Sequence, residues 1–197
     1  MRPTVRFTVE EAQAAAKTWG FNCGPGALCA ITGMTPAEIR PHMGDFEAKR
    51  YTNPTLMASI LKGLAIHVTR VHEAKGENAR DVPWMAANLP LFGLMRVQWE
   101  WPWTSPGVPM AARYRYTHWV AIDRVQRDDP LYMADVFDVN AACVGGWIPW
   151  TEWDKQLVPW LLRECHPKAS GGWWPTHCWQ VARPSDVPPK DSPKGKT

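Results

Sequence analysis

The most informative segment of the chain is Asn22-Cys23-Gly24-Pro25-Gly26-Ala27-Leu28-Cys29-Ala30. Its glycine–proline pair suits a tight turn with proline in a first helical turn, so we expect a helix to begin at Cys23 and to end at Gly33. A cysteine at a helix start lies at the positive end of the helix dipole, which favours thiolate over thiol. The neighbouring amides can hold an oxyanion. Cys23 is therefore the candidate nucleophile, the alternative being a cysteine that only packs between helices.

Helix signals flank this stretch, and strand signals follow it. Thr8-Val9-Glu10-Glu11 is a capping box that opens a helix ending near Gly20, and Thr35-Pro36 starts another short helix. Periodicity predicts further helices at 55–62, at 82–88 and from Trp150. Alternating and β-branched runs predict strands at 64–71, 91–99, 118–125 and 131–139, and Gly171-Gly172-Trp173-Trp174 precedes a final strand through Val181. Helices first and antiparallel-type strands afterwards indicate an α+β fold with the helices on one side of an antiparallel sheet.

The candidate base is the histidine of Thr117-His118-Trp119-Val120-Ala121-Ile122. His118 begins an apolar strand directly after a proline-punctuated loop, 102–116, so its side chain projects from the sheet edge where a cleft would lie. A histidine there can take the proton of a thiol if the start of the cysteine helix packs against the strand. The alternative is a surface or hydrogen-bonded histidine.

The third member of the site is expected from the next strand, Met133-Ala134-Asp135-Val136-Phe137-Asp138-Val139-Asn140. Alternation places Asp138 and Asn140 on one face and Asp135 on the other. Either of the first two side chains could orient the imidazole, but a carboxylate also stabilises the imidazolium formed during reaction. Asp138 is our choice and Asn140 the reserve.

These residues carry a family resemblance. The helix-initial Cys-Gly-Pro, the distant His-Trp-Val-Ala-Ile strand and the following strand ending in Asp resemble papain-like cysteine peptidases, most closely the bacteriocin-processing C39-type peptidases, over Asn22 to Trp153. The segment 146–153 is similar to the strand and helix that follow the aspartate in that group. The resemblance implies a papain-like fold and a thiol-dependent hydrolase, a peptidase or amidase working through an acyl-enzyme. Cys23 would be nucleophile, His118 base and acid, and Asp138 orienter.

One position departs from this family. Its members carry a glutamine about six residues before the cysteine, which completes the oxyanion hole, but here that position is Lys17, with Thr18 next to it and Gln13 a helical turn further back. Asn22 is the candidate substitute; otherwise the backbone amide of Cys23 acts alone. The departure keeps a second hypothesis open, a papain-fold binding module of a phage or secretion assembly. A third hypothesis, a cysteine-dependent acyl or amide transferase, uses the same residues.

The substrate cleft is expected to include Gly24, Trp101, Trp103 and Trp119. The glycine would let a substrate backbone approach, and flat aromatic walls suit extended peptides or sugars. A zinc-stabilised adaptor is a weaker alternative, built from Cys165-His166, His177-Cys178 and Cys143. Its spacing lacks the Cys-x2-Cys knuckle of structural zinc sites, so we expect neither metal nor cofactor.

Length and composition limit the remaining classes. The chain has 197 residues, 45% of them hydrophobic, which fits a single domain over residues 1–184 followed by a disordered tail, 185–197. A net charge of +3 from scattered basic residues argues against a nucleic-acid partner. No apolar run approaches the roughly 20 residues that cross a bilayer. The N-terminus lacks a signal-peptide pattern and the five cysteines are odd in number, so we expect a cytoplasmic protein without a disulfide framework. The expected partner is a peptide or protein substrate, and the oligomeric state is open.

Overall fold

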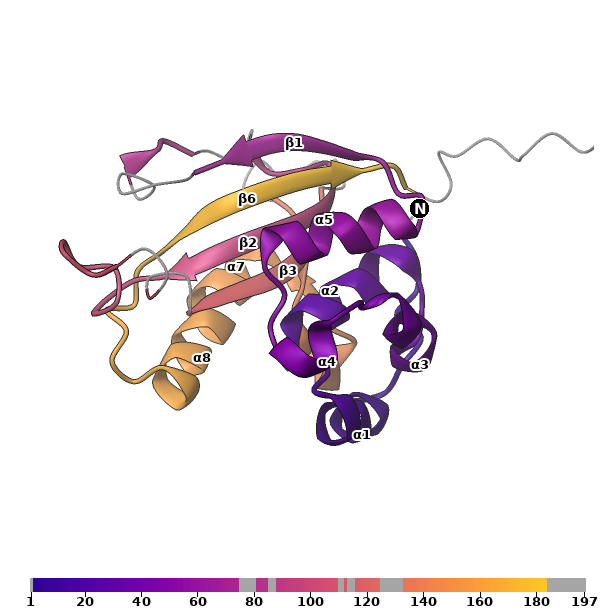
Figure 1. Ribbon diagram of the computed structural model, residues 1–197. Helices are drawn as coiled ribbons and strands as arrows, with labels where there is room; N and C mark the ends of the chain where they lie inside the picture. The colour runs from indigo at the N-terminus through magenta and orange to yellow at the C-terminus, as the bar shows by residue number, and fades with distance from the viewer. Residues whose placement is uncertain are drawn as a thin grey trace, which may run out of the picture.

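The computed structural model describes residues 2–74, 81–84, 88–109, 112, 116–124 and 133–183. The expected tail at 185–197, the start of the expected strand at 131–139 and part of the expected helix at 82–88 lie outside these residues. So does most of the second half of the loop before His118. Figure 1 shows helices gathered in the first part of the chain and a twisted sheet built mainly from the second part.

The N-terminal helices begin and end where local signals predict. The first, α1 (Val9–Trp19), has the Thr8/Glu11 capping box and ends at Gly20 with a left-handed φ of 84°. The second begins at Cys23 and ends at Gly33, as predicted. The helical segments of this half are α1 (Val9–Trp19), α2 (Cys23–Thr32), α3 (Pro36–Ile39), η1 (Arg40–His42), α4 (Phe46–Lys49) and α5 (Pro54–Gly63). In the described ranges, no helix combines the length and the hydropathy needed to cross a bilayer.

The strands of the described residues form one antiparallel sheet. They are β1 (Val68–Glu73), β2 (Phe92–Trp99), β3 (Thr117–Asp123), β4 (Asp135–Phe137), β5 (Trp147–Pro149) and β6 (Trp173–Val181), in the order β1-β6-β2-β3-β4-β5. The α+β prediction is confirmed. The first strand begins at Val68 rather than residue 64, because Leu64 caps α5 and Ala65 turns the chain with a φ of 56°.

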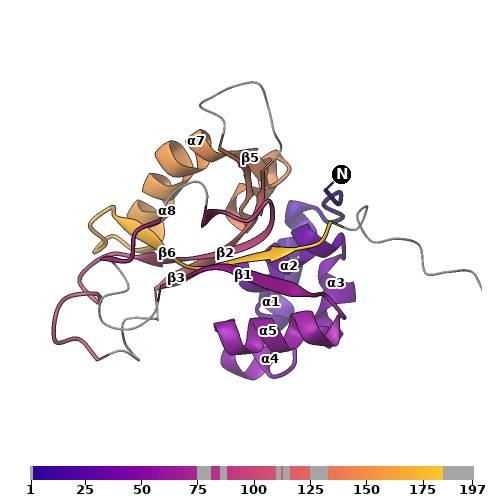
Figure 2. The ribbon, with the colours of Figure 1, turned by 90° about the horizontal axis from the view of Figure 1, so that it is seen from above.

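The expectation that all helices lie on one side of the sheet is wrong. The segments α7 (Trp150–Glu152), η5 (Trp153–Leu157, a π-helical turn) and α8 (Val158–Cys165) cover the opposite face from α1–α5, as Figure 2 shows. Every residue of β2 is buried, so the sheet needs a cover on both faces. Leu94, Trp119 and Trp179 belong to the core under the N-terminal helices, whereas Met95, Val120 and Trp153 belong to the other core.

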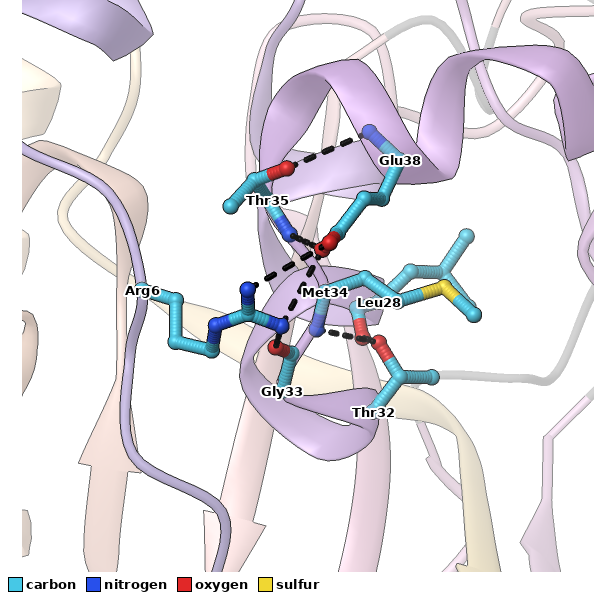
Figure 3. Close-up of polar contacts among 7 residues, drawn as sticks. All are labelled: Arg6, Leu28, Thr32, Gly33, Met34, Thr35 and Glu38. Atoms are coloured by element: carbon cyan, nitrogen blue, oxygen red, sulfur yellow. Dashed lines mark hydrogen bonds and ion pairs between the residues drawn. The ribbon is translucent and has the colours of Figure 1, made fainter.

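The N-terminal segment is tied to the C-terminal end of α2. The Arg6 guanidinium donates to Glu38 Oε1 and Oε2 at 3.3 Å and to the Gly33 carbonyl at 3.3 Å (Figure 3). Glu38 also accepts from the Thr35 backbone N–H at 2.8 Å, and Thr35 Oγ1 accepts from the Glu38 N–H at 3.2 Å, which is a capping box for α3. These contacts fix the far end of the helix that carries Cys23.

A buried acidic pair lies at the end of β3 and β4 away from the site. Asp123 and Asp135 face each other in the register of the two strands, and both are nearly fully buried. Arg2 donates to Asp135 Oδ2 at 2.5 Å, and Arg183 donates to Asp123 Oδ1 at 2.6 Å. The two arginines supply the charge that burial of two carboxylates requires.

Candidate active site

Cys23 is the first residue of α2, and Asn22 is the cap that starts the helix there. Asn22 Oδ1 accepts from the Gly24 N–H at 3.2 Å, and Asn22 Nδ2 donates to the Arg50 carbonyl at 3.1 Å. The Asn22 side chain is therefore hydrogen-bonded both to the start of α2 and to the segment 50–52. The Gly24 N–H already donates to this cap. The Cys23 N–H, at the first helical position, has no carbonyl one turn before it in the helix.

Two glycines next to the cysteine allow close packing of the protein on itself. A Cβ at Gly24 would lie 2.2 Å from Thr52 Oγ1, and a Cβ at Gly26 would lie 3.0 Å from Val139. Gly24 is buried, so its small size admits Thr52 rather than a substrate backbone. The two glycines thus let the start of α2 pack against Thr52, just before α5, and against Val139, just after β4.

His118 lies between the thiol and a carboxylate. Its Nε2 is 2.7 Å from Asp138 Oδ2, and its ring is hydrogen-bonded to the Cys23 thiol. Because Nε2 is engaged by the carboxylate, Nδ1 is the nitrogen left for the sulfur. The backbone N–H of Trp119 also donates to the Cys23 sulfur. The structure therefore brings together Cys23, His118 and Asp138, which are separated in sequence but expected to meet.

Asp138 is fully buried and accepts hydrogen bonds on both oxygens. Oδ2 accepts from His118 and from Trp153 Nε1 at 2.9 Å, and Oδ1 accepts from the backbone N–H and the Nδ2 of Asn140, both at 2.9 Å. Asn140 thus supports Asp138 instead of touching the imidazole. Trp153, which begins the π-helical turn η5, was missed in the sequence as a site residue. The only signal for Trp153 in the sequence was that it ends the segment 146–153, which is similar to the segment after the aspartate in C39-type peptidases.

The electrostatics favour a charged pair. Burial alone would raise the pKa of the Cys23 thiol, but the positive charge of His118 and the hydrogen bonds from His118 and Trp119 hold it below its ordinary value of 9.0. Burial alone would lower the pKa of His118, but the charges of Asp138 and Cys23 hold it well above 6.5. Burial opposes the ionised form of Asp138 too, and His118, Trp153 and Asn140 hold the pKa of its carboxyl below 3.8. These directions favour a thiolate, an imidazolium and a carboxylate in sequence.

A tryptophan covers the outer face of the imidazole. The rings of Trp99 and His118 are stacked with centroids 5.8 Å apart and planes 25° apart. Trp99 is the last residue of β2, is only 2% exposed and lines the cleft described below. Its ring restricts the tilt of the imidazole, so that both ring nitrogens stay on their partners.

The pair opens into a cleft of about 530 Å³ between α1, the start of α2, the start of β3 and α8. The lining includes Cys23, His118, Asn140 and, from α1, Gln13. Lys17 is not among the described residues that line the cleft, although it occupies the position where the family carries glutamine. Gln13 lies one helical turn earlier on the face of α1 that also presents Val9, Ala12 and Ala16 to the cleft.

The expected aromatic walls lie elsewhere. Trp119 is 2% exposed, packs against Trp179 and donates its indole N–H to the Thr52 carbonyl at 2.7 Å. Trp103 is buried, stacks on Tyr116 with centroids 3.8 Å apart and contacts His166 edge-on. Trp101 is 53% exposed. Neither these tryptophans nor Gly24 are among the cleft residues, whose aromatic members in the described ranges are Phe21, Trp99, His118 and His166.

The other cysteines differ in their surroundings. Cys29 and Cys178 are buried, and burial raises the pKa of Cys178 to about 12 and that of Cys29 even further. Cys165 is exposed at the rim of the Cys23 cleft beside His166. The side chain of Cys143 is not among those described. No group of three or more His, Cys, Asp or Glu side chains within the described residues is arranged to hold a metal ion.

Comparisons with known proteins found no relative of this chain. No protein-family model matches the chain, and no curated protein and no solved structure matches it at a significant level.

Proposed function

We propose that the chain is a thiol-dependent hydrolase of the papain-like class, a peptidase or amidase, with Cys23 as nucleophile, His118 as base and acid, and Asp138 as orienter. The observation that carries the proposal is the continuous relay from the Cys23 sulfur through both nitrogens of His118 to the buried carboxylate. The pKa directions of its three members all favour the ion pair that makes a thiol nucleophilic.

The chemistry follows from the relay. The Cys23 thiolate attacks a carbonyl carbon, a C–S bond forms, and the carbonyl electron pair moves to oxygen. Collapse of this oxyanion breaks the C–N bond, and the imidazolium of His118 gives its proton to the leaving amine. A thioester then remains on Cys23. Neutral His118 takes a proton from water, the water attacks the thioester, and the acid product and the thiolate–imidazolium pair are released.

The oxyanion is stabilised by the Cys23 backbone N–H and, in this proposal, by the side-chain amide of Gln13. Gln13 is exposed and lines the same cleft as Cys23 and His118. The Asn22 amide is a poorer candidate because Nδ2 already donates to Arg50. An oxyanion donor lowers the barrier by roughly 3–4 kcal/mol. With Gln13 in the cleft, Lys17 no longer favours a catalytically inactive binding module.

Hydrolysis and acyl transfer share this machinery, and they differ only in whether water or an amine resolves the thioester. The proposed substrate is a peptide or protein, because a cleft of about 530 Å³ has room for an acyl group with flanking residues. The proposed compartment is the cytoplasm, since the cysteines at 23, 29, 165 and 178 are free and a catalytic thiol needs reducing conditions.

The test is the rate of alkylation of Cys23 by iodoacetamide at pH 6, read by mass spectrometry. Cys165 is exposed in the same cleft, so it is replaced by serine in every sample, and Cys143 is replaced as well. We expect fast single labelling, absence of labelling in Cys23→Ala, and slow labelling in His118→Ala. The matched control is His42→Ala, an exposed histidine at the end of η1, which should label as fast as the parent.

An unreactive Cys23 with an ordinary pKa near 9, unchanged by His118→Ala, would contradict the proposal and favour the binding module. If labelling behaves as expected, incubation of the acyl-enzyme with and without an added amine separates transfer from hydrolysis. Release of free acid alone identifies a hydrolase.

A further inference from the structure

A second groove lies on the face of the sheet that α1–α5 cover, outside the Cys23 cleft. It consists of two adjoining cavities of about 550 and 390 Å³, which share Ala58, Arg70 and Trp179. Helix α5 forms one wall along its whole length, from Asn53 at its cap to Lys62 in its last turn, and strands β1, β6 and β2 form the floor. We call this the α5 groove.

The α5 groove is rich in cations. Arg70, Arg96 and His177 line the end near the start of α5, and Lys62 and His67 line the other end. Glu73 is the acidic residue among the described lining residues; its Oε1 is 3.5 Å from Arg70 Nε and 4.0 Å from His177 Nε2. Three permanently charged side chains, Arg70, Arg96 and Lys62, face one carboxylate, Glu73, so the groove is net positive and attracts an anionic ligand.

Two buried groups give the groove a defined floor. Arg96 is 4% exposed and is held in place by hydrogen bonds to Thr117 Oγ1 at 3.0 Å and to Thr176 Oγ1 at 3.4 Å. Trp179 is 1% exposed and lines both cavities; its indole N–H has no acceptor within the described part of the chain. A fixed guanidinium and an indole suit a ligand that offers both oxygen acceptors and apolar surface.

The dimensions favour an extended ligand over a compact one. The ten residues of α5 span about 15 Å, which is the length of four or five residues of extended chain. The positive side chains lie at both ends of that span, so a single small anion would meet only one set. A peptide with spaced carboxylates would meet both.

We propose that the α5 groove binds an acidic, extended peptide segment. The groove adjoins the candidate active site, because Thr117 accepts a hydrogen bond from Arg96 and also lines the Cys23 cleft beside His118. The segment is the recognition part of the substrate, a statement that rests on the proposed function. The binding itself does not depend on the thiol chemistry.

The experiment measures fluorescence anisotropy of a labelled pentaglutamate peptide with the full-length Cys23→Ala chain at low salt, with pentaglutamine as the neutral probe. Arg70 and Lys62 are exposed, so Arg70→Glu and Lys62→Glu should fold, and each should weaken pentaglutamate binding by about tenfold or more. Glu73→Gln, which removes the competing carboxylate, should strengthen it. The matched control is Arg163→Glu on α8, an exposed arginine on the other side of the sheet, which should bind as the parent does.

Equal binding of the two peptides, or wild-type affinity in both groove variants, overturns the proposal. A single glutamate or inorganic phosphate that binds as tightly as the pentapeptide also overturns it, because the groove would then be a site for small anions. Since Cys23→Ala is used throughout, loss of binding is a different result from failure of the thiol to react. Both results can be read independently.

Discussion

The replacement Asp138→Asn tests the candidate site most directly, because the new side chain keeps the shape and changes only charge and donor pattern. Both oxygens of Asp138 accept from donors: His118 and Trp153 on Oδ2, and the backbone and side chain of Asn140 on Oδ1. An amide NH2 group turned toward Asn140 faces two donors. Turned toward His118 it faces the Trp153 indole N–H, and it can donate to His118 Nε2 only when the ring carries its proton on Nδ1, the tautomer that cannot take a proton from the thiol.

The magnitude follows from burial. Asp138 is fully buried, and removing one partner of a buried charge pair costs about 3–5 kcal/mol of the free energy of unfolding. For a domain of this size the melting temperature should fall by about 6–20 °C. The pKa of His118 falls without the carboxylate, so the imidazolium no longer supports the thiolate. If the pKa of Cys23 returns to 9.0, only about one thiol in a thousand is ionised at pH 6.

The assay is the iodoacetamide alkylation rate of Cys23 at pH 6, at a temperature well below the melting point of every variant. We expect Asp138→Asn to react at least tenfold more slowly than the parent. Asp135→Asn is the matched control, because Asp135 is also buried and is ion-paired with Arg2, but it lies opposite Asp123, at the other end of β3 from His118. It should lose comparable stability and keep the parent's alkylation rate. Equal slowing in both variants, or no slowing in Asp138→Asn, refutes the reasoning.

Three further outcomes are expected. Hydrolysis of a p-nitrophenyl acyl ester should be fastest between the lowered pKa of Cys23 and the raised pKa of His118. The rate should fall at acidic pH, because the thiolate is protonated, and at alkaline pH, because the imidazolium is lost. A rate that only rises through pH 9 would contradict this. Gln13→Ala should reduce ester turnover about 100–1000-fold while Lys17→Ala leaves it unchanged, and equal effects would remove Gln13 from the oxyanion site. Trp153→Phe should lower the free energy of unfolding by about 1.5–3 kcal/mol in a urea titration, since it removes one hydrogen bond to a buried carboxylate.

Much of the fold was predictable because its helix boundaries are local events. The Thr8 and Thr35 capping boxes and the Gly20 and Gly33 ends use residues within one turn of each other, so the sequence contains the whole signal. The burial of both faces of the sheet could not be predicted in this way, because it depends on residues that are far apart in the sequence. The strand 92–99 carries Arg96 and Gln98 among its apolar residues, so its sequence alone does not show that both of its faces are buried, and the cover of the second face comes from the later helix that starts at Trp150.

The candidate site was likewise predictable only in part. Helix-start position and strand alternation were enough to propose Cys23, His118 and Asp138, because each is a property of a few consecutive residues. The supporting residues were not visible. Trp153 reaches Asp138 from a different element, and Gln13 enters the cleft only because α1 packs with that face toward the start of α2. Such contacts depend on how helices dock, which periodicity does not encode.

A short segment before α5, residues 50–52, explains how the Cys23 thiol and the His118 imidazole are held next to each other. The Arg50 carbonyl accepts from Asn22, the cap of the cysteine helix, and Thr52 packs where only Gly24 leaves room. The Thr52 carbonyl in turn accepts from the indole of Trp119, the residue after His118. Residues 50–52 therefore touch both the helix start that presents the sulfur and the strand that presents the ring. Because the Trp119 backbone N–H also donates to the sulfur, the pair is positioned by the protein before any substrate arrives, which is the condition for a thiolate that reacts without further reorganisation.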